Sequence, residues 1–162
     1  MEVLLWLENT PLAQWVLASS WANPVLLCMH AVGMALVVGC GLMTNMRIVG
    51  FARSVPLTIF RQLFAAAWVG VCLNVSSGAL LFISAAHKYA GNWTFQLKIA
   101  LILAATIATW VTWRILATEQ PYTAEQQLSA RARVAAIVTT VFWIGAIIAG
   151  RMIAYTLTMG PE

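Results

Sequence analysis

The chain has 162 residues, of which 62% are hydrophobic and only 9% are charged, with a net charge of +4. An ordinary soluble domain carries about 25% charged residues. Too few charges are therefore present to cover a water-exposed surface, and lipid must contact most of the exterior. Asp is absent, and every Glu lies near a terminus or in the 119–125 connection. No basic stripe with interleaved aromatic residues is present, so we expect no nucleic-acid partner.

The first 20 residues differ in pattern from the rest of the chain. The stretch "EVLLWLENTPLAQWVLASS" mixes tryptophans and leucines with acidic and amide side chains, and Pro11 breaks it. This pattern is typical of an amphipathic segment that lies in the membrane interface. It begins with Glu2 instead of basic residues, so we expect no cleavable signal peptide. We predict two units, an interfacial segment at 1–20 and a membrane-spanning unit at 21–162.

Four apolar segments follow, each near or above the roughly 20 residues that a helix needs to cross the hydrocarbon core. Asn23-Pro24 suits the start of the first one, because Pro is accepted in the first turn of a helix. The connections are short, which makes sequential helices antiparallel neighbours. We therefore predict an all-α integral membrane protein, an up-down four-helix bundle. Its spans are Trp21–Met46, Leu57–Ala86, Thr94–Ile115 and Arg133–Thr158.

The distribution of basic residues predicts the orientation of this bundle. Six arginines flank the first and third connections, whereas three basic residues lie toward the opposite side. Because cytoplasmic loops carry an excess of Lys and Arg, we place both termini outside a bacterial-type cytoplasmic membrane. The six arginines are Arg47, Arg53, Arg61, Arg114, Arg131 and Arg133, and the other three residues are Lys88, Lys98 and Arg151.

The chain has two histidines, and both fall within or next to an apolar span. His30 lies nine residues beyond Trp21, roughly 9–13 Å below the outer interface at about 1.5 Å per residue. His87 lies six residues before Trp93, roughly 9 Å below the same interface. Two facing imidazoles are what a bis-imidazole haem b site needs, because each axial bond uses a neutral ring nitrogen. We predict His30 and His87 as the axial ligands of one haem b per chain.

Four further residues at this level suit a haem. Gly33 and Ser84 lie near helical spacing from the two histidines, and their small side chains would leave room for a flat porphyrin. Lys98 and Arg151 reach the same outer half, where cationic side chains suit the propionate carboxylates. We predict all four as cofactor-binding residues. Either cation alone is also explained by snorkelling to the interface.

The same residues allow other interpretations. His30 can instead bond to a neighbouring helix, and His87 can be an interfacial histidine. Cys28, Met29 and Met34 offer soft sulfur ligands that suit Cu(I), and the His30 imidazole also suits copper. Of these residues, only His30 and Met34 share a helix face. Asn74 suits a bond between helices or a contact to a quinone carbonyl. An intramembrane ionisable residue nevertheless favours a functional role.

Three segments carry a resemblance to a known group of membrane proteins. They are "LLCMHAVGMALVVGCGLMTNMRIVG", "SGALLF" and "WTFQLKIALIL", and together they cover about half of the chain. They resemble small copper-resistance-D-type proteins and HemJ-type protoporphyrinogen oxidases. The resemblance implies a four-helix core and, in the HemJ type, a bound haem b. It also implies roles for His30 and Lys98, which match the histidine of the first helix and the lysine of the third.

These observations lead to one main functional hypothesis and two alternatives. We expect a membrane b-type cytochrome that carries electrons between the quinone pool and a periplasmic partner through one bis-His haem b. The alternatives are a protoporphyrinogen-oxidase-like membrane enzyme and a copper-handling membrane protein. Besides the lipid bilayer, we consider a quinone and a second copy of the chain as candidate partners.

Overall fold

A computed structural model describes most of the chain, and its described part contains helices and no strands. Four long helices are apolar and long enough to cross a membrane. This finding confirms the expectation of an all-helical, multi-pass membrane protein with four apolar helices. The four are α3 (Ala22–Val49), α5 (Leu63–Ser84), α7 (Trp93–Thr118) and α8 (Ala130–Thr158). The structure describes the whole chain except residues 1, 52–54, 56–58, 60–61, 120–127 and 159–162.

The second span ends earlier than predicted. Helix α5 stops at Ser84 because the backbone of Ala85 leaves the helical region, with φ −150° and ψ 47°. A separate short helix, α6 (Ala86–Gly91), follows it. His87 therefore lies on α6 and not at the end of a continuous span. The predicted start at Leu57 lies outside the described residues.

Two short helices precede the spans, α1 (Glu2–Glu8) and α2 (Pro11–Ala18). Pro11 occupies the first turn of α2, and the Thr10 hydroxyl accepts a bond from the backbone N–H of Ala13. This N-cap satisfies one of the donors that a helix start leaves open. Helix α2 packs on α3 and α5, and α1 packs on α5 and α6. The interfacial position of this segment stays a prediction.

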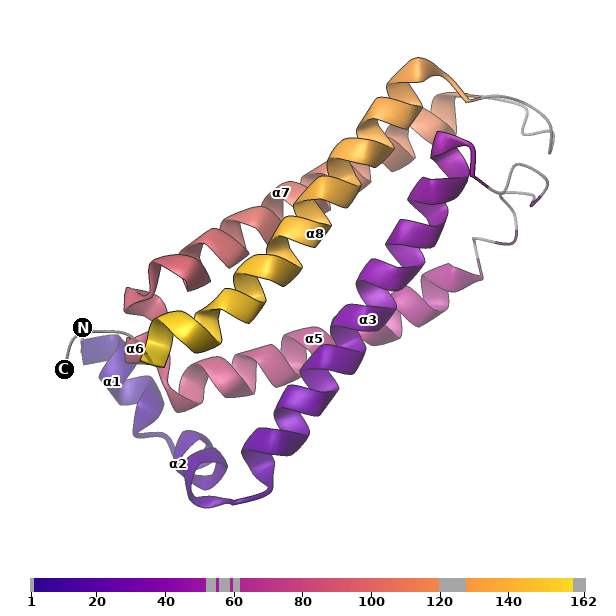
Figure 1. Ribbon diagram of the computed structural model, residues 1–162. Coiled ribbons are helices and arrows are strands. Elements are labelled where there is room, and N and C mark those ends of the chain that lie inside the picture. Colours follow the sequence, from indigo (N-terminus) through magenta and orange to yellow (C-terminus); the bar gives the residue numbers. More distant parts are fainter. Residues whose placement is uncertain (1, 52–54, 56–58, 60–61, 120–127, 159–162) are drawn as a thin grey trace.

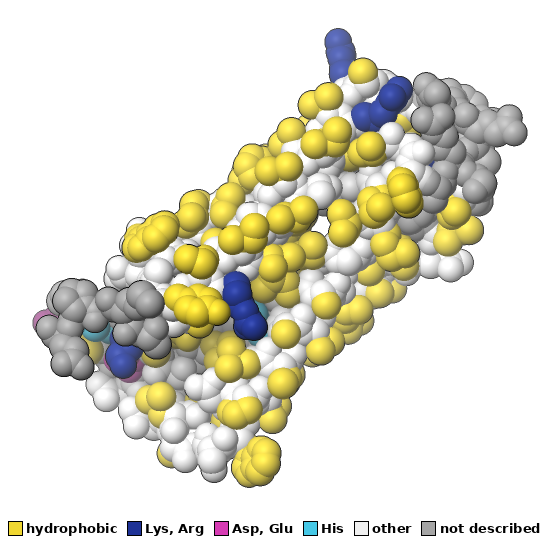
Figure 2. Space-filling view, in the orientation of Figure 1, with side chains coloured by type: hydrophobic (Ala, Val, Ile, Leu, Met, Phe, Trp, Pro, Cys, Tyr) yellow, Lys and Arg dark blue, Asp and Glu magenta, His cyan; other side chains and the backbone are white. Residues whose placement is uncertain are grey.

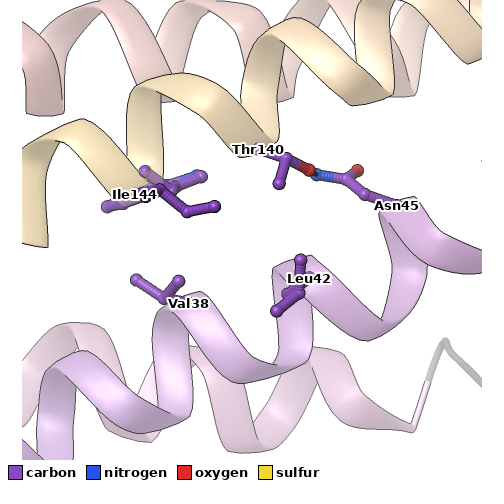
Figure 3. Close-up of a pocket in the computed structure, with 6 residues that line it drawn as sticks. Val38, Leu42, Asn45, Thr140 and Ile144 are labelled. Atoms are coloured by element: carbon purple, nitrogen blue, oxygen red, sulfur yellow. Dashed lines mark hydrogen bonds between the residues drawn. The ribbon is translucent and has the colours of Figure 1, made fainter.

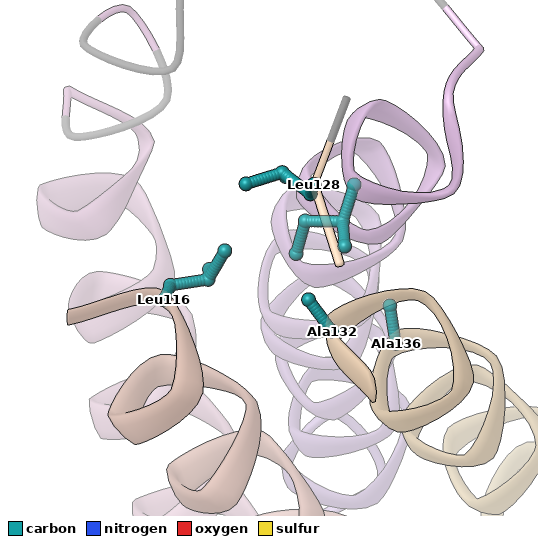
Figure 4. Packing of buried hydrophobic residues seen from close by; sticks show 5 residues of the cluster. Leu116, Leu128, Ala132 and Ala136 are labelled. Carbon is teal, nitrogen blue, oxygen red and sulfur yellow. The ribbon is translucent and has the colours of Figure 1, made fainter. Parts of the chain in front are cut away.

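The long helices pack as two pairs, α3 with α5 and α7 with α8, and contacts between α3 and α8 join the pairs (Figure 1). A cluster of buried hydrophobic side chains closes the end where α7 stops and α8 begins (Figure 4). Elsewhere hydrophobic side chains cover most of the visible surface (Figure 2), as lipid contact requires. The cluster consists of Ile48, Leu116, Leu128, Ala132 and Ala136.

Helices α3 and α5 cross in backbone contact at Gly33 and Gly70. A Cβ added to Gly33 would come within 2.7 Å of the Asn74 nitrogen, and one added to Gly70 within 2.8 Å of the Gly33 carbonyl oxygen. Small residues allow this close approach between membrane helices. The crossing lies one turn from His30 and holds α5 against that side chain.

Candidate functional site

His30 projects from α3 toward α5, where its Nδ1 has two partners. The backbone oxygen of Asn74 and the Oγ of Ser77 each lie 3.2 Å from that nitrogen. A backbone carbonyl can only accept a hydrogen bond, so Nδ1 carries the proton. The Ser77 hydroxyl is itself committed as a donor to the backbone oxygen of Leu73. The contacts therefore favour the neutral tautomer in which Nε2 has a bare lone pair.

The bare Nε2 faces Lys98, which projects from α7. Its Nζ lies 3.3 Å from the His30 Nε2, so the lysine is the donor of this bond. Two positive charges at this separation would repel each other strongly in a membrane interior. We therefore expect the pair to hold one positive charge between them. Lys98 and His30 are thus a proton donor and a proton acceptor already in contact.

Asn74 ties the same turn of α5 to α3 by a second bond. Its side-chain Nδ2 donates to the backbone oxygen of His30 at 3.1 Å, while its own backbone oxygen accepts from the His30 ring. This reciprocal pair fixes both the backbone and the ring of His30. The interpretation of Asn74 as a bond between helices is confirmed.

Two glycines provide the space for the pair. A Cβ on Gly78 of α5 would lie 3.0 Å from the His30 Cε1, so only glycine leaves the imidazole its full room there. Gly150 of α8 lies against the other partner, since its Cβ would be 3.4 Å from the Cε of Lys98. All four long helices therefore contribute to one polar centre, which consists of His30, Asn74, Ser77, Gly78, Lys98 and Gly150.

Aromatic rings lie on the α6 side of this centre. Phe82 is one turn beyond Gly78 on α5, and Phe95 is one turn before Lys98 on α7. The two rings stack with centroids 5.5 Å apart, and Tyr89 of α6 lies 5.6 Å from Phe95. Burial raises the pKa of the Tyr89 hydroxyl above its ordinary value.

The remaining predicted site residues make no hydrogen bond to the His30–Lys98 pair within the described part of the chain. His87 is exposed, and its backbone N–H donates to the Glu8 carboxylate at 2.7 Å. The buried Ser84 hydroxyl donates to the backbone oxygen of Leu81. Gly33 faces the α5 backbone, where an added Cβ would lie 2.7 Å from the Asn74 nitrogen. Arg151 is exposed on α8. Of the six predicted site residues, the structure brings His30 and Lys98 into direct contact, a pairing that the prediction did not include.

The two predicted axial ligands, His30 and His87, do not contact each other in this structure. Both ring nitrogens are bonded to protein groups, and His87 is exposed on another helix. Among the described residues no group of three or more His, Cys, Asp or Glu side chains could hold a metal ion. The predicted haem and copper ligand sets stay predictions.

A second polar layer lies in the opposite half of the helices. The Asn45 side chain donates to the Thr140 hydroxyl at 3.1 Å, joining α3 to α8, and the Trp143 indole N–H donates to Thr109 of α7. A cavity of only about 10 Å³ lies beside the first bond (Figure 3), between Val38 and Ile144. Ligand pockets usually have roughly 300–1,000 Å³. We interpret this layer as helix packing.

The sequence contains signals for two residues that the prediction left out of the site. Ser77 and Gly78 follow Asn74 at spacings of three and four, which places all three on one helix face. Gly150 carries no comparable signal, because its role depends on where Lys98 arrives from α7.

Comparison of the chain with protein-family models, curated proteins and solved structures finds no match.

Proposed function

We propose that the protein is a membrane oxidoreductase of the protoporphyrinogen-oxidase type, in which His30 and Lys98 move protons. One observation carries the proposal: the 3.3 Å contact between the imidazole Nε2 and the lysine Nζ. The two residues in contact are the two to which the family resemblance assigns roles. A bis-His cytochrome would instead need His87, which lies outside the centre.

The proposed orientation is the up-down bundle with both termini outside a bacterial-type cytoplasmic membrane. Arg47 lies in the last turn of α3, Arg114 lies near the end of α7, and Arg131 lies in the first turn of α8, so these basic residues gather toward one end. The Arg114 guanidinium lies 5.0 Å from the Trp110 ring centroid, a pairing that suits a membrane interface. With this end in the cytoplasm, the polar centre lies in the outer half of the membrane.

Each oxidation of a porphyrinogen removes two electrons and two protons from the substrate. In the proposed step a hydride equivalent leaves for an acceptor of the quinone class, and Lys98 turns from His30 to give its proton to the reduced acceptor. The freed Nε2 of His30 takes the accompanying proton from the substrate, and this proton then crosses to Lys98. Substrate plus quinone becomes product plus quinol, and the pair returns to its starting state.

The proposal depends on general acid–base catalysis by groups that already contact each other. A positioned proton-transfer group typically contributes about 10²–10⁴-fold to a rate. Haem b, which the resemblance implies, would supply one-electron transfer when bound. We assign no step to it.

Purified protein in lipid nanodiscs, supplied with protoporphyrinogen and a soluble quinone, tests this function by the appearance of porphyrin fluorescence. We expect activity in the wild type and a loss of about 100-fold or more in His30→Ala and Lys98→Gln. His87→Ala is the matched control, and it should retain the activity because His87 is exposed outside the centre.

Two results would contradict the proposal. A wild type that forms no porphyrin under any quinone supply would overturn the substrate class. Full activity in His30→Ala would show that the pair is structural. A haem spectrum that disappears in both histidine variants would instead support the bis-imidazole cytochrome.

A further inference from the structure

The spanning helices contain cations without any acidic counterpart. Lys98 lies on α7 and Arg151 on α8, whereas the four long helices contain neither Asp nor Glu. The hydrogen bond that Lys98 makes is to the neutral ring of His30. Within the described residues the Arg151 guanidinium has no hydrogen bond or ion pair. An uncompensated charge in low dielectric is costly, so this part of the membrane favours an anion.

Helical periodicity places Arg151 on the face of α8 that looks toward α3. Thr140 marks this face, because its hydroxyl accepts the bond from Asn45 of α3. Arg151 follows Thr140 by eleven residues, which is close to three turns of about 3.6 residues. Ile144 and Ile147 complete the same stripe, and both are more than 40% exposed. Arg151 therefore lines the outer part of the seam between α3 and α8, on a stripe that lipid can reach.

The side chain of Lys98 reaches the same turn of α8 from the neighbouring helix α7. The Nζ of Lys98 would lie 3.6 Å from a Cβ on Gly150, the residue next to Arg151. His30, Lys98 and Gly150 are all only partly buried. Figure 2 shows a cationic side chain beside histidine atoms on the otherwise hydrophobic face, in the region between α8 and α3. The polar centre is thus open sideways, toward the bilayer.

We infer that Lys98 and Arg151 form a binding site for the anionic head group of an amphiphile that enters from the outer leaflet between α3 and α8. A carboxylate or a phosphate supplies the missing negative charge, and its oxygens match the ammonium and the guanidinium donors. The apolar tail lies along the exposed isoleucines of α8. This inference does not require the oxidase function, because it depends only on charge and access.

A fluorescent long-chain carboxylate, cis-parinaric acid, tests the site against its uncharged methyl ester. The protein is placed in phosphatidylcholine nanodiscs, and energy transfer from its eight tryptophans reports binding. We expect the acid to bind about tenfold more tightly than the ester, since a hydrogen bond to a charged group has about that effect. Arg151→Gln and Lys98→Gln should each bring the acid close to the ester.

Two control variants separate charge from fold. Arg151→Lys keeps the cation and should keep most of the preference for the acid. Lys88→Gln removes an exposed cation of α6, outside the seam, and should leave the preference unchanged. Equal binding of acid and ester by the wild type, or a preference that survives both glutamine variants, would overturn the site and leave Arg151 as a snorkelling residue.

Competition then identifies the source of the anion. Loss of parinarate binding when phosphatidylglycerol replaces part of the phosphatidylcholine would support a lipid head group as the occupant. Loss on addition of inorganic phosphate alone would support a free anion reaching the same cations and would overturn entry from the bilayer. Oxidase assays on the same nanodiscs remain separate, so failure of one proposal leaves the other measurable.

Discussion

The imidazole of His30 is held by contacts that act on opposite sides of the ring. Acceptors on α5 hold the proton on Nδ1, and Lys98 donates to Nε2 from α7. A ring with one fixed tautomer presents the same lone pair at all times, which is the condition for directional proton transfer. Asn74 adds a bond to the backbone of the same residue. Together these contacts fix the position of both the ring and the backbone of His30.

Gly78→Ala tests how closely this ring is packed. The new methyl group would lie 3.0 Å from the His30 Cε1, so either the ring or α5 must move. We expect a loss of about 1–3 kcal/mol in the free energy of unfolding and a large fall in activity, measured by thermal unfolding and by the porphyrin assay. Gly41→Ala is the control, because a Cβ there meets nothing within 4 Å. A Gly78→Ala variant with unchanged unfolding and unchanged activity would show that the ring is loosely held.

Because of Tyr89, the free energy of unfolding should change with pH in the alkaline range. Its pKa is raised by burial beside the aromatic rings, whereas an unfolded tyrosine ionises near pH 10. The unfolded state therefore loses its proton first, and stability should fall as the pH rises above about 10. Absorbance of tyrosinate during an alkaline titration checks this, with Tyr89→Phe identifying the transition. Ionisation of Tyr89 at the free-tyrosine pH would contradict it.

Helices α3 and α5 are in direct backbone contact at their crossing, whereas α8 contacts α7 at Gly145 through a side chain. Gly33 and Gly70 bring the two backbones together one turn from His30, and this crossing sets the distance over which Asn74 can bond to α3. At Gly145 of α8, by contrast, an added Cβ would meet the Leu101 side chain of α7 at an ordinary 3.5 Å. The first pair should therefore tolerate less change than the second.

Gly33→Ala is the test at this crossing. Its Cβ would lie 2.7 Å from a backbone nitrogen of α5 and 2.9 Å from a backbone oxygen, and neither atom can rotate away. We expect separation of α3 from α5, with a cost of several kcal/mol at the upper end of overpacking changes. Gly39→Ala serves as control, since nothing lies within 4 Å of its Cβ. Equal unfolding temperatures for the two variants would refute the tight crossing.

The molecule as a whole has its polar centre nearer one end and its dense hydrophobic cluster at the other. The described start of the chain and the end of α8 lie at the same end of the molecule (Figure 1), as an even number of spans requires. The cluster around Ile48 and Leu116 lies at the arginine-rich end. This arrangement places rigid packing on the proposed cytoplasmic side and the accessible polar residues on the outer side.

Fusion reporters test this orientation. Alkaline phosphatase, which is active only outside the cytoplasm, should be active when fused after residue 162 and inactive when inserted in the 119–125 connection, because the arginines hold that connection inside. Enzyme activity of the two fusions in intact cells measures the difference. The reverse pattern would invert the bundle and place the His30–Lys98 pair in the inner half.

The sequence by itself determined the class of protein and which residues to examine. Four runs of apolar residues can only be satisfied in lipid as helices, since every backbone group must be bonded within its own segment. His30 and Lys98 stood out because ionisable residues are rare in such runs. Asn74 was recognised for the same reason, as a polar side chain in mid-span.

The tertiary structure decided which of these residues meet. Sequence spacing suggested His87 as the partner of His30, but the chain leaves the helix at Ala85 and carries His87 onto α6. Lys98 is the residue that contacts His30, because α7 packs on α8 at Gly150. Lys98 and Gly150 are about fifty positions apart in the sequence. Depth in the membrane follows from counting residues along one helix, whereas the direction that a side chain faces depends on how its helix packs against the others.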